Sequence, residues 1–361
     1  MRKIIFWFHL ALGLAAGLVI AWMAATGIVL AFQPLATQWA VGSLATVVPP
    51  ADTPRLDLDA LLGKLREKEG RLPSQFTVRN DPRAVAVAAF GRERTVYVDP
   101  YTGEERGEAP ARLGAFFATV EHLHRWFALE EPRRDIGKAV THAAALCFAA
   151  LIAGGLFLWW RGRSFRLKRG LQGKARDWSL HNVCGFWASP FLLLLALTGV
   201  ILAYPWANAL LFRLAGAPVP PPQERKGFGG NGGGGGGGEP VELHAEVWLA
   251  AAQAQVPGWQ SVSLRLPPRG GKVTLSITEP SPWTPHPVSQ LAVDAESGEV
   301  VKWEPYAGQS LGRRLRGWVR PLHTGEAFGL PGALVNVLSA LAALILVWTG
   351  FALSWRRFTR R

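Results

Sequence analysis

Cysteine is almost missing from this chain, and so are the short motifs that mark most soluble enzymes. The two cysteines, Cys147 and Cys184, lie in apolar segments, and we interpret them as small packing residues because their spacing does not match a thiolate metal site. No glycine motif for phosphate or a dinucleotide is present, and no His-Glu-x-x-His pattern predicts a zinc site. The sequence therefore gives no support for nucleotide-dependent or zinc-dependent catalysis.

Charged residues are absent from four long stretches, namely residues 4–32, 139–160, 182–206 and 331–355. Each stretch is longer than the roughly 20 residues that a helix needs to cross a bilayer, and a core helix of a soluble protein rarely stays uncharged for so long. The sequence therefore predicts four membrane-spanning helices surrounded by membrane lipid. The first is expected to be an uncleaved span, because 29 residues are too many for the apolar region of a signal peptide.

The net charge of +13 is concentrated beside these stretches. Thirteen Lys and Arg residues lie at positions 2–3, 161–179 and 356–361, with Asp177 as the single acid among them, so these segments carry +12. Basic residues in short segments next to spans mark the cytoplasmic side of a membrane. We therefore expect a protein of a bacterial inner membrane, with both ends and the loop 162–179 in the cytoplasm, and no nucleic-acid partner.

The chain has the pattern of a duplication. Two sets of residues match at an offset of 172 positions, His9, Gly13, Thr26 and Gly27 against His181, Gly185, Thr198 and Gly199. At an offset of 195 positions, residues 99–103 match 294–298, and Gly137, Gly155 and Trp160 match Gly332, Gly350 and Trp355. The Pro- and Gly-rich stretch 218–240 accounts for the difference between the offsets. The predicted architecture is a span, an outer domain and a span, repeated once.

Each outer segment has an α+β pattern. In the first, leucines at positions 58, 61, 62 and 65 share one helical face, and strands are predicted at 75–78, 84–89 and 95–98. In the second, a helix is predicted near 242–254, with strands near 262–266, 273–277, 291–294 and 300–302. The expected organisation is spans at 1–33, 136–161, 180–207 and 330–356, outer domains at 34–135 and 208–329 with a flexible linker at 223–239, a basic loop at 162–179 and a tail at 357–361.

Histidine is the residue type that points to chemistry. His9 and His181 occupy equivalent positions near the cytoplasmic ends of the first and third spans. Neutral imidazoles on facing helices suit the two axial positions of a b-type haem, and Gly13 and Gly185, four residues further on, would leave room for the porphyrin. Helix packing is the alternative role for the two glycines.

A second set of histidines lies on the outer side. His124 and His323 both occur in Leu-His sequences before a span, and they are the pair that the repeat favours for a second haem. His142, inside the second span, is the rival for His124, because a polar residue in a membrane is usually functional. Arg125 and Arg320 are candidates to pair with haem propionates, or else extend to lipid headgroups. The remaining histidines are interpreted as ordinary residues, namely His122, His244 and His286.

The chain resembles the PepSY-associated transmembrane family in four segments whose order and spacing match: 97–103 (Tyr-Val-Asp-Pro-Tyr-Thr-Gly), 293–298 (Val-Asp-Ala-Glu-Ser-Gly), 123–126 (Leu-His-Arg-Trp) and 321–325 (Pro-Leu-His-Thr-Gly). The resemblance implies two periplasmic PepSY domains on a four-helix bundle, and some members of the family are di-haem ferric-siderophore reductases. The Gly-rich insertion and His142 depart from the simplest family pattern.

Three functions are compatible with these features. The first is a reductase that moves electrons through two b-type haems, from a cytoplasmic protein or a quinol to a periplasmic ferric siderophore or other iron chelate. The second is a membrane-anchored PepSY module that binds an envelope partner or a peptidase and performs no chemistry; the paired His-x-x-x-Gly motifs argue against it, since an anchor needs no buried histidine. The third is a siderophore or metal permease, which the lack of acidic residues in the apolar stretches disfavours.

The topology is testable with reporter fusions at Gly170 and Gly235. A fusion at Gly170 should report the cytoplasm and a fusion at Gly235 the opposite side, because the basic loop marks the cytoplasmic face. If both fusions report the same side, the arrangement of four spans is wrong.

Overall fold

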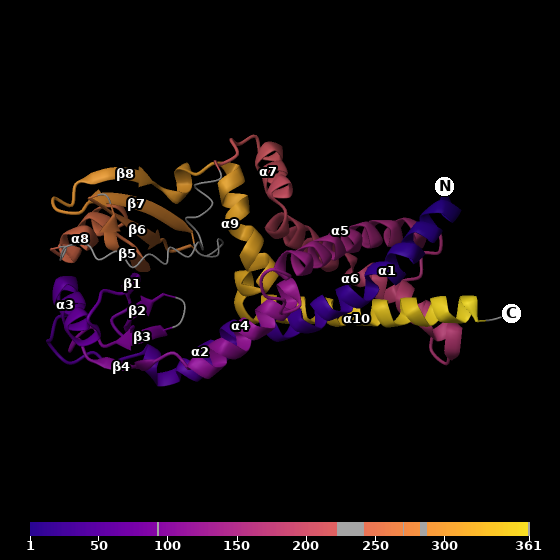
Figure 1. Ribbon diagram of the computed structural model, residues 1–361, viewed down its shortest axis with the longest axis horizontal. Coiled ribbons are helices and arrows are strands. Elements are labelled where there is room, and N and C mark those ends of the chain that lie inside the picture. Colours follow the sequence, from indigo (N-terminus) through magenta and orange to yellow (C-terminus); the bar gives the residue numbers. More distant parts are fainter. Residues whose placement is uncertain (92–93, 222–241, 270, 282–286, 360–361) are drawn as a thin grey trace. The chain divides into compact units, whose positions relative to one another are not determined.

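The computed structural model describes residues 1–91, 94–221, 242–269, 271–281 and 287–359, so the predicted linker 223–239 and His286 lie outside the described residues. The chain divides into two compact units (Figure 1). A helical unit contains Met1–Leu35, Ala115–Ala217 and Leu311–Arg361, and a sheet unit contains Ala36–Gly114 and Pro218–Ser310.

Four long helices build the helical unit: α1 (Arg2–Ala31), α5 (Arg134–Trp159), α6 (Gly173–Ala203) and α10 (Gly329–Phe358). Helices α1 and α6 each pack against both α5 and α10, so the four form a closed bundle. Many of the buried residues are small, for example Ala16, Ala144, Ala196 and Ala343. Small residues let helix backbones approach closely, which is how helices pack in membranes.

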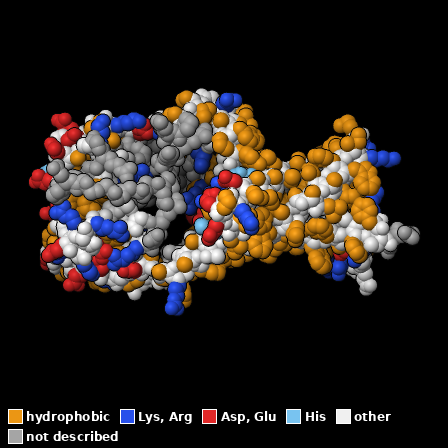
Figure 2. Space-filling model, in the orientation of Figure 1, with side chains coloured by type: hydrophobic (Ala, Val, Ile, Leu, Met, Phe, Trp, Pro, Cys, Tyr) orange, Lys and Arg blue, Asp and Glu red, His pale blue; other side chains and the backbone are white. Residues whose placement is uncertain are grey.

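The outer surface of the bundle is apolar. Leu18, Leu338 and Trp348 are 75%, 64% and 72% exposed, and hydrophobic side chains cover most of the visible bundle (Figure 2). Within the described residues, four helical segments are long and apolar enough to cross a membrane, and each overlaps one of the four predicted spans. The prediction of a membrane protein with four spanning helices is confirmed.

The chain also contains the shorter helices α2 (Gln33–Val41), α4 (Ala111–Trp126), α7 (Pro205–Leu214) and α9 (Leu311–Thr324), and the 3₁₀ turns η1 (Gly42–Ala45), η3 (Tyr306–Gly308) and η4 (Glu326–Phe328). The ends of α4 and α9 lie against the starts of α5 and α10 at two glycines. A methyl group at Gly137 would overlap the Trp126 carbonyl, and one at Gly332 would overlap the Gly325 carbonyl. These two glycines therefore permit the close backbone contacts that hold α4 and α9 on the bundle.

The sheet unit contains one antiparallel sheet with the strand order β4-β3-β2-β1-β5-β6-β7-β8. Its strands are β1 (Gln75–Arg79), β2 (Ala86–Phe90), β3 (Arg94–Val98), β4 (Glu105–Glu108), β5 (Ser261–Arg269), β6 (Lys272–Thr278), β7 (Val288–Asp294) and β8 (Val300–Glu304). Two four-stranded meanders thus join through β1 and β5, where Thr77 lies opposite Ser263 and their hydroxyl oxygens are 2.7 Å apart. The predicted strands are confirmed, and β4 is an addition.

Helices α3 (Leu58–Glu69) and α8 (Ala245–Gln255) contact each other, and each supplies a carboxylate to the start of the other. The backbone N–H groups of Ala245 and Glu246 donate to Asp59, at 2.6 and 3.2 Å, and the N–H of Leu58 donates to Glu246 at 2.9 Å. Unpaired N–H groups at a helix start favour a negative partner. The exchange ties the two meanders together.

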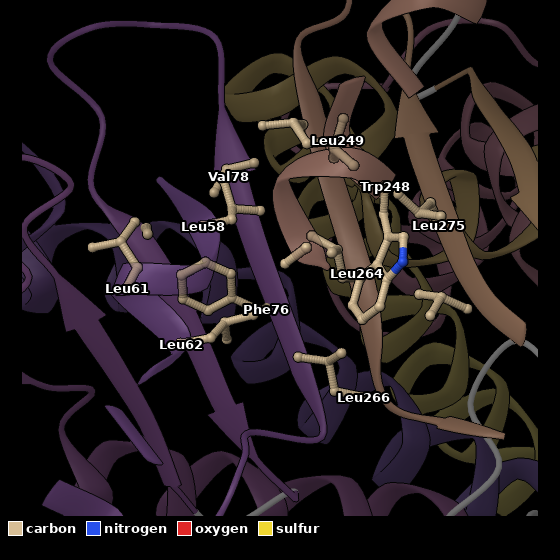
Figure 3. Packing of buried hydrophobic residues seen from close by; sticks show 14 of the residues in the cluster. Leu58, Leu61, Leu62, Phe76, Val78, Trp248, Leu249, Leu264, Leu266 and Leu275 are labelled. Carbon is tan, nitrogen blue, oxygen red and sulfur yellow. The ribbon is translucent and has the colours of Figure 1, made fainter. Parts of the chain in front are cut away.

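The core of the sheet unit lies between these helices and the sheet. Leu61 and Leu62 of α3 lie beside Phe76 of β1, and Trp248 of α8 lies against Leu264 of β5 (Figure 3). All five side chains are at most 1% exposed. The Trp248 indole N–H donates to the Ala295 carbonyl at 3.0 Å, so its one polar atom is satisfied in the core.

The importance of this core can be measured with one substitution made at two positions. Val273→Ala in β6 removes two methyl groups from a fully buried side chain and should lower the free energy of unfolding by about 2 kcal/mol. Val301→Ala in β8 is the control, because Val301 is 46% exposed and its loss should change little. The measurement is the urea concentration at which half of the sheet unit becomes cleavable by a protease, followed in the purified full-length protein. Equal midpoints for the two variants would contradict the assigned core.

Candidate functional site

Four histidines lie partly or largely buried in the helical unit, each on a different helix. His9 is on α1, His181 is on α6, and His124 and His323 lie in the last turns of α4 and α9. His9 and His124 contact α5 and α1, which belong to the first half of the chain. His181 and His323 contact α10 and α6, which belong to the second half. These four residues are the ligands that the sequence favours.

Each of these imidazoles packs against a glycine of a neighbouring helix. A methyl group placed on the glycine would lie near Cε1 of the imidazole at 3.3 Å for Gly155 and His9, 3.7 Å for Gly350 and His181, 3.6 Å for Gly27 and His124, and 3.2 Å for Gly199 and His323. A missing side chain therefore lets each ring rest on the backbone of the facing helix. A methyl group would be tight against the ring at Gly155 and Gly199, and at ordinary contact distance at Gly27 and Gly350.

Three of the rings are also held by a threonine that precedes the glycine. Nδ1 of the imidazole and Oγ1 of the threonine are 2.9 Å apart in the pairs His124–Thr26, His323–Thr198 and His181–Thr349. These threonines are 9%, 4% and 1% exposed, respectively. Water therefore has little access to the contact.

The threonines determine which ring nitrogen carries the proton. Each Oγ1 lies 2.7 or 2.8 Å from the backbone carbonyl four residues earlier, at Trp22, Leu194 and Ile345. Two oxygens this close need a hydrogen between them, and a hydroxyl has only one. The hydroxyl therefore donates to the carbonyl and accepts from Nδ1–H. This assigns the proton to Nδ1 and leaves the lone pair on Nε2, the nitrogen that remains free to bind a metal.

His9 is the exception among the four. The position equivalent to the threonine is Gly154, where a methyl group would lie 3.6 Å from Nδ1 of His9. This nitrogen is buried and has no hydrogen-bond partner within the described residues; the Leu151 carbonyl lies near it without forming a hydrogen bond of normal geometry. One imidazole of the set thus lacks the anchor that the other three have.

The inner pair consists of His9 and His181. Their ring centres are 6.3 Å apart, and the ring planes are nearly perpendicular, at 87°. At this distance and angle the two rings are arranged edge to face. They belong to helices α1 and α6, which each pack on α5 and α10.

The outer pair consists of His124 and His323. Burial, followed by the effect of nearby His323, lowers the pKa of His124 to about 4, and burial also lowers the pKa of His323. Both imidazoles are therefore neutral near pH 7, which is the form that binds metals. The Trp22 indole N–H donates to the Leu123 carbonyl at 3.0 Å, and the Asn336 amide donates to the carbonyls of Leu322 and His323, both at 3.1 Å. These bonds fix the backbone beside each outer histidine.

The other histidines have different surroundings. His142 lies beside Tyr204, with ring centres 5.3 Å apart, and His122 is exposed and makes an edge contact with Trp126, with ring centres 4.8 Å apart. His244 lies at the start of α8 in the sheet unit. His142 has Tyr204 as its ring neighbour, and it directly follows Thr141, whose hydroxyl donates to the Arg125 carbonyl at 2.7 Å.

The remaining candidates occupy ordinary positions. A methyl group at Gly13 would lie 3.8 Å from Leu151, and one at Gly185 would lie 3.5 Å from Leu346, so these glycines face apolar side chains. Arg125 pairs with Glu121 at 2.7 Å and lies over the Trp126 ring. Arg320 is exposed on α9. Within the described residues, no group of three or more His, Cys, Asp or Glu side chains forms a site for a bare metal ion.

The roles of the three threonines and of the four glycines that contact the rings are not evident from the sequence alone. Thr26-Gly27 and Thr198-Gly199 appear in the repeat, but the sequence does not say that they contact His124 and His323. Thr349-Gly350 is a third copy of the same dipeptide, and Gly154-Gly155 is its altered counterpart. The recurrence of Thr-Gly in three of the four apolar stretches is the signal that points to these contacts.

The helical bundle and the antiparallel sheet define a membrane protein with four spanning helices and a separate sheet unit. Comparison with protein families identifies it further: the model of the PepSY-associated TM region matches residues 6–357. The match covers nearly the whole chain, so this protein belongs to that family. A search of curated proteins found no match.

Proposed function

We propose that this protein carries electrons across a bacterial inner membrane through two b-type haems, one held by His9 and His181 and the other by His124 and His323. The observation that supports the proposal is the common arrangement of these four imidazoles, each resting on a glycine in an apolar bundle. Three of them have Nδ1 hydrogen-bonded and Nε2 free. A helical anchor without a cofactor has no need for such residues.

The geometry of the inner pair fits a bis-histidine site. A bond from a divalent metal to an imidazole nitrogen is about 2.0–2.1 Å long, and a ring nitrogen lies about 1.1 Å from the centre of a ring with bonds of about 1.33 Å. Imidazoles bound to opposite sides of one metal therefore have ring centres about 6.3 Å apart. The centres of His9 and His181 are 6.3 Å apart.

The two pairs lie at different depths in the bundle. His9 and Thr26, which contacts His124, are 17 residues apart on α1, and the same spacing separates His181 from Thr198 on α6. At 1.5 Å per residue this is about 25 Å along each helix. Two sites at these levels lie near opposite faces of a hydrocarbon layer about 30 Å thick, and the conjugated macrocycles that they would hold would shorten the electron-transfer distance between the irons.

A duplication explains why the two halves hold their histidines alike. In the first half α1 and α5 provide His9 and Gly155, and in the second α6 and α10 provide His181 and Gly350. The outer pair repeats the relation, since His124 faces α1 and His323 faces α6. We assign the meanders of the sheet unit to two PepSY-like domains on the periplasmic side, and the termini and the basic loop to the cytoplasm.

When bound, haem supplies a one-electron couple whose potential depends on its ligands and surroundings. The protein residues hold Nε2 of neutral imidazoles in place, exclude water and supply an apolar medium. The electron donor is a cytoplasmic protein or a quinol, and the acceptor is a periplasmic ferric siderophore or a similar iron chelate. Fe(II) binds hard oxygen ligands more weakly than Fe(III), so reduction releases the iron. Arg125 and Arg320 remain the candidates to pair with propionates at the outer site.

Two other functions use the same fold. A PepSY module that only binds an envelope partner or peptidase would need the helices as an anchor, and a permease would need polar groups along a path. Among the described residues of the spanning helices, the one fully buried acid is Asp177, which pairs with Arg356 at 2.7 Å near the cytoplasmic ends of α6 and α10. Neither function explains the paired imidazoles, and a protein without haem would favour the first of them.

The inner site is tested by removing either imidazole. His9→Ala or His181→Ala should lower the haem content of the purified protein by about half, because each site needs both ligands and the outer site is separate. His122→Ala, which alters an exposed histidine, is the control. Full haem content and an unchanged low-spin spectrum in both single variants would contradict the assignment.

The outer site is tested by comparing His323→Ala, His124→Ala and His142→Ala. We expect the first two to lose the outer haem and to stop reduction of an external ferric chelate, and His142→Ala to keep both haems, since His142 lies beside Tyr204 and not beside Thr26. Loss of haem in His142→Ala with His124→Ala unaffected would transfer the ligand role to His142. Retention of both haems in His323→Ala would refute the outer site.

A further inference from the structure

The hydrogen bonds to the four imidazoles are not equivalent. Thr26, Thr198 and Thr349 each accept from Nδ1–H of a histidine while donating to their own helix. The fourth ring, His9, has Gly154 in place of a threonine, and its Nδ1 is buried without a hydrogen-bond partner in the described part of the chain. The inner pair therefore combines one anchored ring with one ring that has no anchor.

An acceptor at Nδ1 has two effects on a metal-binding imidazole. It fixes the tautomer and the ring orientation, and it makes the ring a better electron donor to the metal. A ring without the acceptor keeps freedom to turn about its side-chain bonds. A stronger donor stabilises the oxidised metal, so the acceptor also lowers the reduction potential.

We propose that Thr26, Thr198 and Thr349 are positioning residues for the haem-binding imidazoles, and that Gly154 makes His9 the one ligand without a hydrogen-bond anchor. This inference rests on the proposed function. It assigns a distinct property to the inner site, where His181 is fixed by Thr349, whereas His9 has no threonine beside it and has only the Leu151 carbonyl near Nδ1. The inner site then has a higher potential and releases its haem more readily than it would with two anchored ligands.

The alternative role for the threonines is structural, because threonine in a membrane helix often bonds only to the preceding turn. In the structural role the threonine hydroxyl bonds only within its own helix, whereas in the positioning role it also accepts a hydrogen bond from a histidine on another helix. Valine has the shape of threonine without the hydroxyl, and serine keeps the hydroxyl without the methyl group. A series of Thr, Ser and Val at one position therefore separates the hydrogen bond from packing.

The first experiment adds the missing anchor. A side chain at Gly154 fits, because its Cβ would lie 3.6 Å from Nδ1 of His9 and 3.8 Å from Ile5, at ordinary contact distances. Gly154→Thr should lower the midpoint potential of the inner haem and slow its transfer to apomyoglobin. Gly154→Val, with the same shape and no acceptor, is the matched control and should show neither change.

The second experiment removes an existing anchor. Thr349→Val should raise the inner potential and speed haem transfer about tenfold or more, which is the usual cost of losing a hydrogen bond to a metal-binding histidine. Thr349→Ser should restore both values. The outer haem is the internal reference in each variant, because Thr349 contacts only His181 among the four histidines.

The outcomes distinguish this inference from the function on which it rests. If the native protein binds two haems but potentials and transfer rates are the same for Thr and Val at positions 154 and 349, the threonines are only packing residues and the inference is wrong. If the native protein takes up no haem under any condition, the proposed function fails and the inference fails with it.

Discussion

Holding a neutral imidazole inside an apolar bundle is the constraint on which the rest of the helical unit depends. A buried ring nitrogen without a partner is costly, yet the other nitrogen must stay free if the ring is to bind a metal. The protein meets both demands with a two-residue device on a facing helix. Glycine lets the ring rest on the backbone, and the preceding threonine accepts from Nδ1–H while it donates to its own helix. At His9 only the glycine is present, because Gly154 takes the place of the threonine.

The constraint extends into the short helices. The outer rings are carried by α4 and α9, whose ends must be positioned to within a hydrogen-bond length of α1 and α6. Gly137 and Gly332 permit the backbone contact, and Trp22 and Asn336 bond the carbonyls beside the rings. Helix α4 starts three residues after β4 ends, and α9 follows β8 with only η3 between them. Each meander of the sheet unit is thus joined by a short connection to a helix that carries an outer ring, which gives a direct covalent route from the sheet to the proposed outer site.

Much of the fold follows from local sequence patterns. Uncharged stretches predict α1, α5, α6 and α10, because length and polarity suffice to identify a membrane helix. Alternating apolar residues predict seven of the eight strands, and the exception is β4, whose four residues Glu105–Glu108 include no hydrophobic side chain. Helices α4 and α9 are missed because they lie outside the uncharged stretches, and α9 also contains Pro321, which usually ends a helix. The pairing of β1 with β5 is also missed, since it joins strands that are almost 190 residues apart.

The candidate site also has a part that the sequence predicts and a part that it does not. The repeat identifies His9, His181, His124 and His323 because it reports equivalent positions, and it cannot report which helices meet. It therefore assigns space for a porphyrin to Gly13 and Gly185, which face Leu151 and Leu346, and overlooks Gly155 and Gly350, which face the rings. The repeat also leaves His142 as a rival to His124 for the outer ligand. The structure distinguishes the two by their neighbours, because the ring of His142 lies beside Tyr204 and the ring of His124 contacts Thr26. Contacts between helices decide these points, and no local pattern encodes them.

The most direct test of the account is the visible spectrum of the purified full-length protein, together with its haem content per chain. Two b-type haems per chain, both low-spin in the oxidised and reduced states, are the predicted result, because each iron would have two imidazole ligands. A protein that holds no haem after expression with ample haem supply, or one whose haem is high-spin with an open axial position, would contradict the central claim.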